Sequence, residues 1–418
     1  MTAMKPAVAA AAAFVMLALA VTSTAQAQTA EHAAAKAVPS ADDTTDLPIH
    51  SHVQLEAWLQ MHAGMQTPLD RMPAGARMRF LASLRFGERG LGGFDTADLS
   101  ATLAPDEIRA VLALFGPEAE AYAARIPSTG LPDSRDTTVP TASSAIEQRF
   151  NELYLLELSL GNATDLDRGK ALASRYLALF PNARDVDYLR GTSDSDLKLL
   201  YRAASLANSG NPDTVTSAAM AATIDLMAAR GIAAPAELLR ARDALLIARQ
   251  FDSARHFSDA HAAAQLTPLP RILGADADFD GQPTLWQMDV DSDTLGRRPV
   301  DTGPLQIMVL AGCHFSADAA RDIVADPVLG PLFRKHGHWL SLPPGQEDLQ
   351  AVRDWNHEHP QTPMEMLYDR SEWPMFTDWR MPTFYVIRDG KALGSMAGWS
   401  SSSRAELTAL LRRTGLLP

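Results

Sequence analysis

The sequence contains a single cysteine, Cys313, among its 418 residues. One thiol cannot form a disulfide within the chain, so Cys313 is not a structural staple. Long basic runs are also missing and the formal net charge is −13, so nucleic-acid binding lacks the positive surface that it needs. Hydrophobic residues make up 46% of the chain, which predicts a globular protein with an ample core.

The first 27 residues have the three parts of a secretory signal. Lys5 supplies positive charge, residues 7–21 form a short apolar segment, and Ala25-Gln26-Ala27 is a small-x-small cleavage site. We therefore expect a bacterial periplasmic protein with no membrane attachment after cleavage. The rival interpretation is an uncleaved anchor, for which the apolar segment is short. Residues 28–48 are predicted to be a flexible start of the mature chain.

The length predicts two or three domains. Residues 49–267 are expected to form an all-helical domain, and the Pro-, Thr- and Ser-rich residues 128–144 to form a linker or long loop within it. Apolar residues recur at helical spacing in three early stretches, residues 53–61, 78–86 and 103–115. Residues 89–93, which are rich in glycine, are predicted to be a loop.

The second half of this domain is richer in alanine. Six helices are predicted there, at residues 145–160, 165–180, 193–209, 213–230, 235–249 and 252–264. Residues 248–255 and the pair Phe180-Pro181 resemble parts of a tetratricopeptide unit, which would imply a helical-repeat array with a concave surface for a protein partner. The alternative is an irregular helical domain, because no clean repeat period is present.

A connecting segment is expected at residues 268–302. Residues 276–281 resemble half of a calcium-binding EF-hand loop, but the twelfth position is Gln287 and Pro283 interrupts the exit helix, so a polar turn is the competing interpretation. Residues 284–290 and 298–300 are predicted to pair as a β-hairpin.

Cys313 lies where a buried strand is predicted to give way to a helix. Residues 305–311 are apolar except for Gln306, and the residues after Cys313 have helix-forming composition. Unpaired N–H groups and the positive end of the helix dipole would stabilise a thiolate there, and the thiolate is the reactive form. Protonated His314 would add to this effect, and the Ser316 hydroxyl could donate a hydrogen bond to the sulfur.

A second segment is expected to pair with the first. Residues 383–387 are β-branched and aromatic, Asp389-Gly390 is a hairpin turn signal, and residues 392–396 form the returning strand. Pro382 stands at the start of the first of these strands, where a proline is tolerated. A final helix is predicted at residues 404–413.

This order of motifs over residues 303–418 resembles the thioredoxin superfamily, and in particular its periplasmic thiol–disulfide interchange branches. The resemblance implies an α/β/α sandwich and a cis peptide bond at Met381–Pro382, with Pro382 beside the sulfur. Cys313, His314, Ser316 and Pro382 would be the catalytic positions. The resemblance also implies a substrate groove, for which the candidate lining residues are Phe315, Met381, Thr383 and Trp399.

The chain departs from that family at three points. Ser316 replaces the second cysteine, Gly312 replaces a common tryptophan, and residues 305–311 carry no acid. Dithiol cycling is therefore excluded for the monomer. The expected activity is monothiol exchange, isomerase- or reductase-like, on a protein or small-molecule substrate. A thiol from outside the site, either the substrate's own second thiol or a small thiol, must then release the mixed disulfide.

The remaining elements of this domain are a helix at residues 328–336, a strand at 338–342, a helix at 346–358 and an insertion at 360–376. Trp379 and Trp399 could flank Pro382 and form an aromatic groove, although core packing is the more ordinary role of a tryptophan. Five of the seven tryptophans lie in this domain, namely Trp339, Trp355, Trp373, Trp379 and Trp399.

Three other chemistries compete with exchange. A copper or zinc site could use Cys313 with histidines of the same domain, namely His336, His338, His357 and His359. The spacing of these histidines does not place pairs on one helix face, and we expect no metal and no cofactor. A cysteine–histidine hydrolase is disfavoured because an adjacent histidine rarely folds back onto the sulfur. A redox-silent domain that binds peptides or proteins in the same groove, with an inert thiol, is the main alternative.

Overall fold

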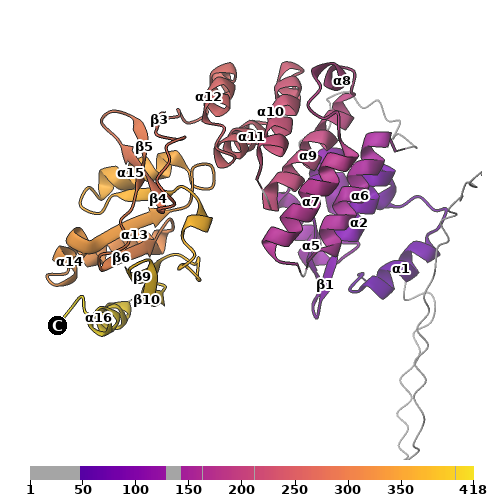
Figure 1. The fold of residues 1–418 in the computed structure, drawn as a ribbon. Helices are drawn as coiled ribbons and strands as arrows, with labels where there is room; N and C mark the ends of the chain where they lie inside the picture. Colours follow the sequence, from indigo (N-terminus) through magenta and orange to yellow (C-terminus); the bar gives the residue numbers. More distant parts are fainter. Residues whose placement is uncertain (1–47, 129–142, 162, 211, 401) are drawn as a thin grey trace, which may run out of the picture. The chain divides into compact units, whose positions relative to one another are not determined.

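A computed structural model describes residues 48–128, 143–161, 163–210, 212–400 and 402–418 of the chain. A helical part comes first, and a mixed β-sheet with its own helices follows (Figure 1). The predicted signal and flexible start, and most of the predicted linker, lie outside the described residues. Within the described residues, no helix combines the length and the apolar character that crossing a membrane requires.

The first helices surround a small apolar core. Leu69, Phe80, Leu99, Ile108 and Val111 are buried in it. Pro105 begins α4, where the missing N–H of proline costs nothing, and the Glu107 side chain accepts from the Ala104 N–H at 2.9 Å. These helices are α1 (His52–Met61), α2 (Ala74–Ser83), α3 (Ala97–Thr102), α4 (Pro105–Ala113) and α5 (Pro117–Tyr122).

A β-hairpin interrupts this helical region, and two predictions there were wrong. Helix α2 ends at Ser83, and β1 (Arg85–Gly87) pairs antiparallel with β2 (Gly90–Gly93), where a helix to residue 86 and then a loop were expected. Gly90 has a φ of +103°, and a Cβ added to it would lie 2.5 Å from His50 Nδ1. Glycine permits this turn, and the helical spacing of the preceding apolar residues concealed it.

The later helices agree with the prediction to within a few residues at each end, and α8 is an addition to it. Side-chain oxygens of Ser144, Thr164 and Asp213 accept N–H groups of the first turns of α6, α7 and α10. The bounds are α6 (Ala145–Ser159), α7 (Asp165–Leu179), α8 (Val186–Arg190), α9 (Asp194–Gly210), α10 (Thr214–Ala229), α11 (Pro235–Ile247) and α12 (Phe251–Ala260).

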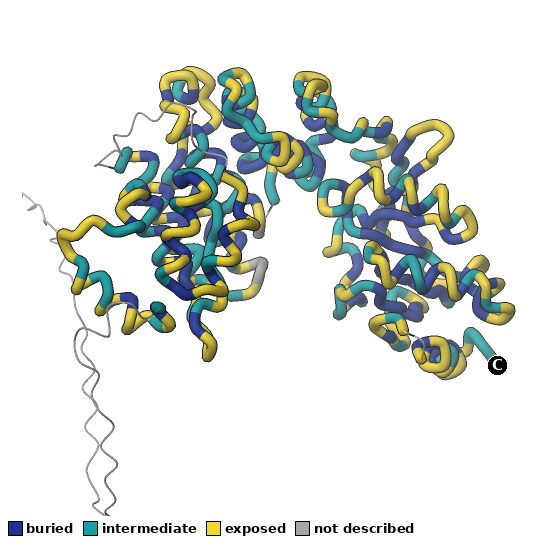
Figure 2. The backbone as a smooth tube through the Cα atoms, turned by 180° about the vertical axis from the view of Figure 1, so that it is seen from behind, coloured by how far each residue is buried: buried dark blue, intermediate teal, exposed yellow. Residues whose placement is uncertain are grey.

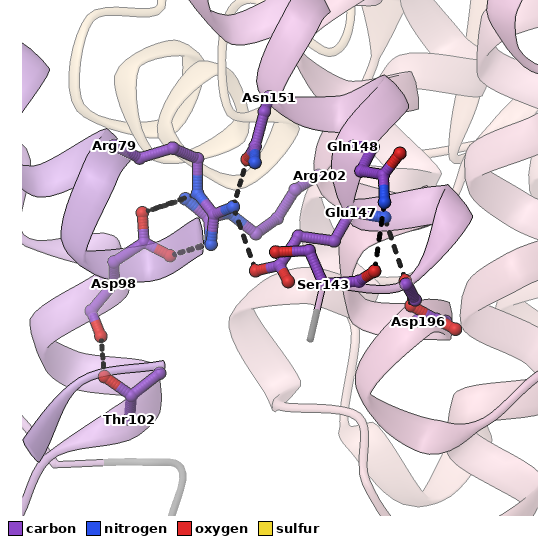
Figure 3. Close-up of polar contacts among 10 residues, drawn as sticks. Arg79, Asp98, Thr102, Ser143, Glu147, Gln148, Asn151, Asp196 and Arg202 are labelled. Carbon is purple, nitrogen blue, oxygen red and sulfur yellow. Dashed lines mark hydrogen bonds and ion pairs between the residues drawn. The ribbon is translucent and has the colours of Figure 1, made fainter. Parts of the chain in front are cut away.

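A buried ion-pair network ties α2, α3, α6 and α9 together (Figure 3). Asp98, only 2% exposed, accepts hydrogen bonds from Arg79 Nε at 3.0 Å and from Arg202 Nη1 at 2.7 Å. Arg79 also donates to Glu147 at 3.3 Å and to Asn151 at 2.5 Å. Burial alone would raise the pKa of Asp98, but its bonds to the two arginines outweigh burial and hold that pKa below its usual value.

The second part of the chain is built on an eight-stranded sheet in the order β10-β9-β6-β7-β8-β4-β5-β3. β6 (Gln306–Leu310), β7 (Gly337–Ser341) and β8 (Met364–Leu367) are mutually parallel neighbours, and β9 (Thr383–Arg388) runs antiparallel to β6. The outer strands are β3 (Arg271–Leu273), β4 (Thr284–Asp289), β5 (Thr294–Pro299) and β10 (Lys391–Ala397).

The structure differs from the prediction in which segments contribute strands to the main sheet. The predicted hairpin is present as β4 and β5, although β5 begins at Thr294 and not at residue 298. It joins the main sheet through β8, so the connecting segment is part of the sheet. The predicted insertion itself supplies β8. The four residues Met364–Leu367 are too few for an alternating pattern of apolar and polar side chains to predict a strand. They form one because β7 and β4 both pair with them.

The two faces of the sheet are covered differently. Ile307 and Val309 of β6 belong to one apolar cluster with residues of α13 (His314–Ala325), α14 (Leu329–His336), α15 (Leu349–Glu358) and α16 (Ser403–Arg413). Met308 and Leu310 alternate with them and pack with Trp373 and Phe376 on the other face. All five residues of β6 are buried (Figure 2).

The expected α/β/α sandwich was therefore only partly right. The chain has the predicted helical part and a mixed sheet with helices. Among the described residues, however, the apolar cluster on the Met308 and Leu310 face of the sheet contains no residue from a helix. Residues 373–379, which are rich in aromatic side chains, take the place of a second helical layer. Their large rings cover the sheet without helical periodicity.

Candidate functional site

Cys313 lies between the end of β6 and the start of α13, as the sequence predicts. It is the N-cap residue of α13, with an extended backbone at φ −120° and ψ 169°, and the Ser316 and Ala317 N–H groups donate to its carbonyl oxygen. The side chain is half-buried. The sulfur is thus placed at the positive end of a twelve-residue helix.

Two polar groups contact the Cys313 sulfur. The thiol donates to the carbonyl oxygen of Met381 at 3.3 Å, and Ser316 Oγ lies 3.4 Å from Sγ. Ser316 is fully buried, and its oxygen also accepts from the Gly312 N–H at 3.3 Å. Because that N–H occupies one side of the oxygen, the Ser316 hydroxyl proton is left free to point at the sulfur. Ser316 is therefore placed to stabilise a thiolate.

The pairing of β6 with β9 brings the proline segment to the sulfur. Leu310 lies opposite Thr383, so the residues just before β9 reach Cys313, although the chain separates the two segments widely. The Met381–Pro382 peptide bond is cis, as the resemblance implies. Pro382 is buried, and Met381 is half-buried. The Met381 carbonyl, which is bonded to the Pro382 nitrogen, accepts a hydrogen bond from the sulfur.

The two residues after Cys313 turn toward solvent. Phe315 is 49% exposed, His314 is exposed, and their ring centroids are 3.9 Å apart. Among the described residues, no hydrogen bond joins the His314 ring to the sulfur, so the predicted effect of a protonated His314 would act only through its charge. Phe315 presents an apolar surface next to Cys313 in the sequence.

Two of the residues predicted to contact substrate use their side chains in contacts within the protein. The Thr383 side chain is buried, and its hydroxyl donates to the Arg380 carbonyl at 2.7 Å. Trp399 donates its Nε1–H to Asp322 of α13 at 2.9 Å and packs its ring 5.6 Å from that of Phe384. Both residues support the sheet and helix around the site. Their local sequence could not show this, because the partners lie on other elements.

Trp379 packs beside the proline segment. It is half-buried and belongs with Met381 and Phe376 to the apolar cluster on the helix-free face of the sheet. The Arg370 guanidinium lies 4.8 Å from its ring centroid. Trp379 therefore supports the predicted aromatic surface near Pro382, while Trp399 packs against α13.

A carboxyl group that the sequence analysis missed also reaches the site. A Cβ built on Gly312 would lie 2.8 Å from Glu347 Oε2 and 3.1 Å from Met381 Sδ, so Glu347 fills the space beside the residue before Cys313. Glu347 comes from the loop between β7 and α15 and is half-buried. Burial raises its pKa above the usual value of 4.5. The one signal in the sequence was Gly312 itself, which leaves room for another side chain.

Two of the histidines considered as metal ligands have other partners in the structure. His338 Nδ1 lies 3.0 Å from Glu365, which also pairs with Arg298, and the His359 ring packs 4.6 Å from that of Trp355. Within the described ranges, no three histidine, cysteine or acidic side chains converge as a metal site would require. Asp278 in the EF-hand-like segment accepts from the Asp280 N–H at 3.1 Å, which is a local turn.

Comparison of the chain with protein-family models, with curated proteins and with solved structures finds no match in any of the three. The function is therefore inferred from the Cys313 site and from the order of the strands that build it.

Proposed function

We propose that this chain carries out monothiol thiol–disulfide exchange through Cys313, on a thioredoxin-like arrangement of strands and helices. One observation carries the proposal. The only thiol of the chain stands at the N-terminus of α13, between a buried hydroxyl from Ser316 and the Met381 carbonyl that precedes Pro382. A hydroxyl donor and the start of a helix both favour the thiolate, which is the reactive form.

The strand order supports the thioredoxin-like part of the proposal. Strands β10, β9, β6 and β7 are neighbours in that order, with β6 and β7 parallel and β9 and β10 an antiparallel hairpin. Helix α13 connects β6 to β7 through α14, and α16 follows β10. The resemblance implies the order of these elements along the chain, namely a strand, the cysteine motif on a helix N-terminus, and the proline before an antiparallel hairpin and a last helix. Strands β8, β4, β5 and β3 extend the sheet beyond it.

The proposed reaction moves no net electrons. The Cys313 thiolate attacks one sulfur of a substrate disulfide, forms a mixed disulfide and expels the other sulfur as a thiolate. A second thiol, from the substrate or from a small molecule, then attacks the substrate sulfur of the mixed disulfide and releases Cys313 as a thiolate again. The Ser316 hydroxyl donates a hydrogen bond to that thiolate, while the α13 N-terminus supplies positive potential.

The residues near the sulfur favour a partly apolar substrate. Phe315 is 49% exposed, and Met381, whose carbonyl contacts the sulfur, is half-buried in the same apolar cluster as Trp379. The same surface supports the second candidate function, a redox-silent module that binds peptides or proteins. We also propose, from the signal-like N-terminal 27 residues, that the protein is periplasmic, which places the thiol in an oxidising compartment.

The rate of reaction with an aromatic disulfide tests the proposal. Attack by Cys313 releases a coloured thiolate, and we expect the native protein to react faster than the same protein in denaturant, with Cys313→Ser as the blank. A native rate below the denatured rate would overturn the proposal. Cys313→Ala then separates the two candidates, because exchange activity is lost in that variant whereas a binding module still binds a reduced or cysteine-free peptide.

A further inference from the structure

A cavity of about 470 Å³ lies within the helical part, and none of its lining residues belongs to the Cys313 site. Residues of α3, α6, α9 and α11 surround it, together with the segments that precede α3 and α11. Clefts that bind small molecules measure about 300–1,000 Å³, so this cavity has the size of a ligand site. The α9 residues that line it recur at helical spacing and form one wall, namely Lys198, Tyr201, Arg202, Ser205, Leu206 and Ser209.

The buried part of the lining is aromatic. Phe150, Tyr154 and Tyr201 are each buried, and aliphatic side chains of α9 and of the segment before α11 complete the apolar surface. The Arg202 guanidinium lies 5.0 Å from the centroid of the Phe150 ring. Asp98 accepts from Arg202 at 2.7 Å, so the charge of this arginine is already balanced. The lining therefore suits a flat apolar body.

The acidic side chains that line the cavity are hydrogen-bonded within the protein. Asp95 accepts from the Tyr154 hydroxyl at 3.0 Å, and the Glu237 carboxylate accepts from the Ala234 N–H at 2.8 Å. The Tyr201 hydroxyl donates to the Glu237 carbonyl at 2.9 Å. The hydroxyl protons of both tyrosines are thus used inside the protein, and a polar ligand must find its hydrogen-bond donors elsewhere in the lining.

Two cationic side chains supply such donors. Lys198 is half-buried and Arg240 is exposed, both line the cavity, and neither forms an ion pair among the residues that the structure describes. Lys198 lies one turn before Tyr201 on the same face of α9. Burial raises the pKa of Tyr201, and the nearby positive charge of Arg240 opposes that rise. Both cations therefore neighbour Tyr201 and give this side of the cavity a positive charge.

We propose that the cavity binds a small organic carboxylate, with its apolar body against the aromatic lining and its carboxylate held by Lys198 and Arg240. A carboxylate has two oxygens and accepts a hydrogen bond from each cation. The mostly apolar lining takes water from a bound anion, which costs less for a singly charged carboxylate than for a doubly charged phosphate. The proposal does not depend on thiol exchange, because no residue of the Cys313 site takes part.

The test compares ligands that share one apolar body. Isothermal titration calorimetry of the protein with naphthoate and with naphthamide measures what the negative charge adds to binding. We expect naphthoate to bind about tenfold more tightly, the worth of one hydrogen bond to a charged group. Added sodium chloride should reduce this preference, because salt screens the exposed Arg240. Naphthyl phosphate, the third ligand, should bind more weakly than naphthoate.

Substitutions in the lining locate the site. Lys198→Met combined with Arg240→Gln removes both charges, and the Kd values of naphthoate and naphthamide should then agree within about twofold. Lys170→Met removes an exposed lysine of α7 that does not line the cavity, so it is the matched control and should leave both Kd values unchanged. Ala101→Phe places a ring in the cavity and should abolish binding of both ligands.

Several results would overturn the proposal. Binding of neither ligand would show that the cavity is not a ligand site, and equal binding of both would show that the cations do not select an anion. An unchanged preference in the double variant would place the site elsewhere, and tighter binding of naphthyl phosphate would reject the carboxylate. Should the double variant not fold, Lys198→Met and Arg240→Gln singly must each remove part of the preference. Failure of exchange at Cys313 leaves every one of these expectations in place.

Discussion

Replacing Asp98 with Asn should destabilise the helical part of the chain more than any ordinary surface substitution. Asp98 is 2% exposed and is the shared acceptor of Arg79, also 2% exposed, and of Arg202, 22% exposed. The amide of asparagine has no charge and turns an NH₂ group toward one guanidinium. Removing one partner from a buried ion pair costs about 3–5 kcal/mol.

The expected magnitude lies at the lower end of this range. Arg79 keeps its bonds to Glu147 and Asn151 in the variant, so the charge left behind is not wholly unpaired. We therefore expect a loss of about 3 kcal/mol in the free energy of unfolding. Urea unfolding followed by far-UV circular dichroism at 222 nm measures it. Asp187→Asn is the control, because its pair with Arg190 is exposed and should change stability by less than about 0.5 kcal/mol.

The pH dependence of this effect has a definite sign. The pKa of Asp98 in the folded protein is held below its usual value of 3.8, so the network stabilises the fold above that value and loses this contribution as pH falls through the folded pKa. The difference in stability between the wild type and Asp98→Asn should thus be largest near neutral pH and shrink in acid. A cost below about 1 kcal/mol at neutral pH, or a difference that does not shrink in acid, would contradict the reasoning.

Three further substitutions test the sheet and the site. Ser316→Ala removes the hydroxyl 3.4 Å from the sulfur, and we expect the native reaction of Cys313 with an aromatic disulfide to slow by about tenfold, the cost of roughly one hydrogen bond to a charged group; an unchanged rate would exclude that bond. Phe384→Ala opens a fully buried position in β9 and should cost about 3–5 kcal/mol in urea unfolding, whereas Phe315→Ala, at a site 49% exposed, should cost less than about 1 kcal/mol, and equal costs would contradict the packing described.

Local patterns in the sequence were sufficient for the elements next to the cysteine. The apolar run before Gly312 predicted β6, the composition after Cys313 predicted α13, and the Asp389-Gly390 turn predicted the hairpin of β9 and β10. Each depends on residues that are close in sequence. The positions of Cys313 and Ser316 at the helix start followed from the same local signals.

Features that depend on distant partners were missed. Glu347 reaches the site only because the loop after β7 folds against Gly312, and no local pattern encodes that approach. Asp98 and Arg79 look like ordinary charged residues in the sequence, yet they are buried together. The β1–β2 hairpin was hidden because apolar residues at helical spacing continue to Phe86, where glycine and strand pairing outweigh helical periodicity.

The most direct test of the central claim is the mass of the intact protein after brief exposure to oxidised glutathione under native conditions, followed by peptide mapping. The account predicts one adduct on Cys313, formed in the folded protein and removed by reduced glutathione with return of the starting mass. An adduct that forms only after denaturation would contradict exchange at Cys313 and favour a site that binds without reacting.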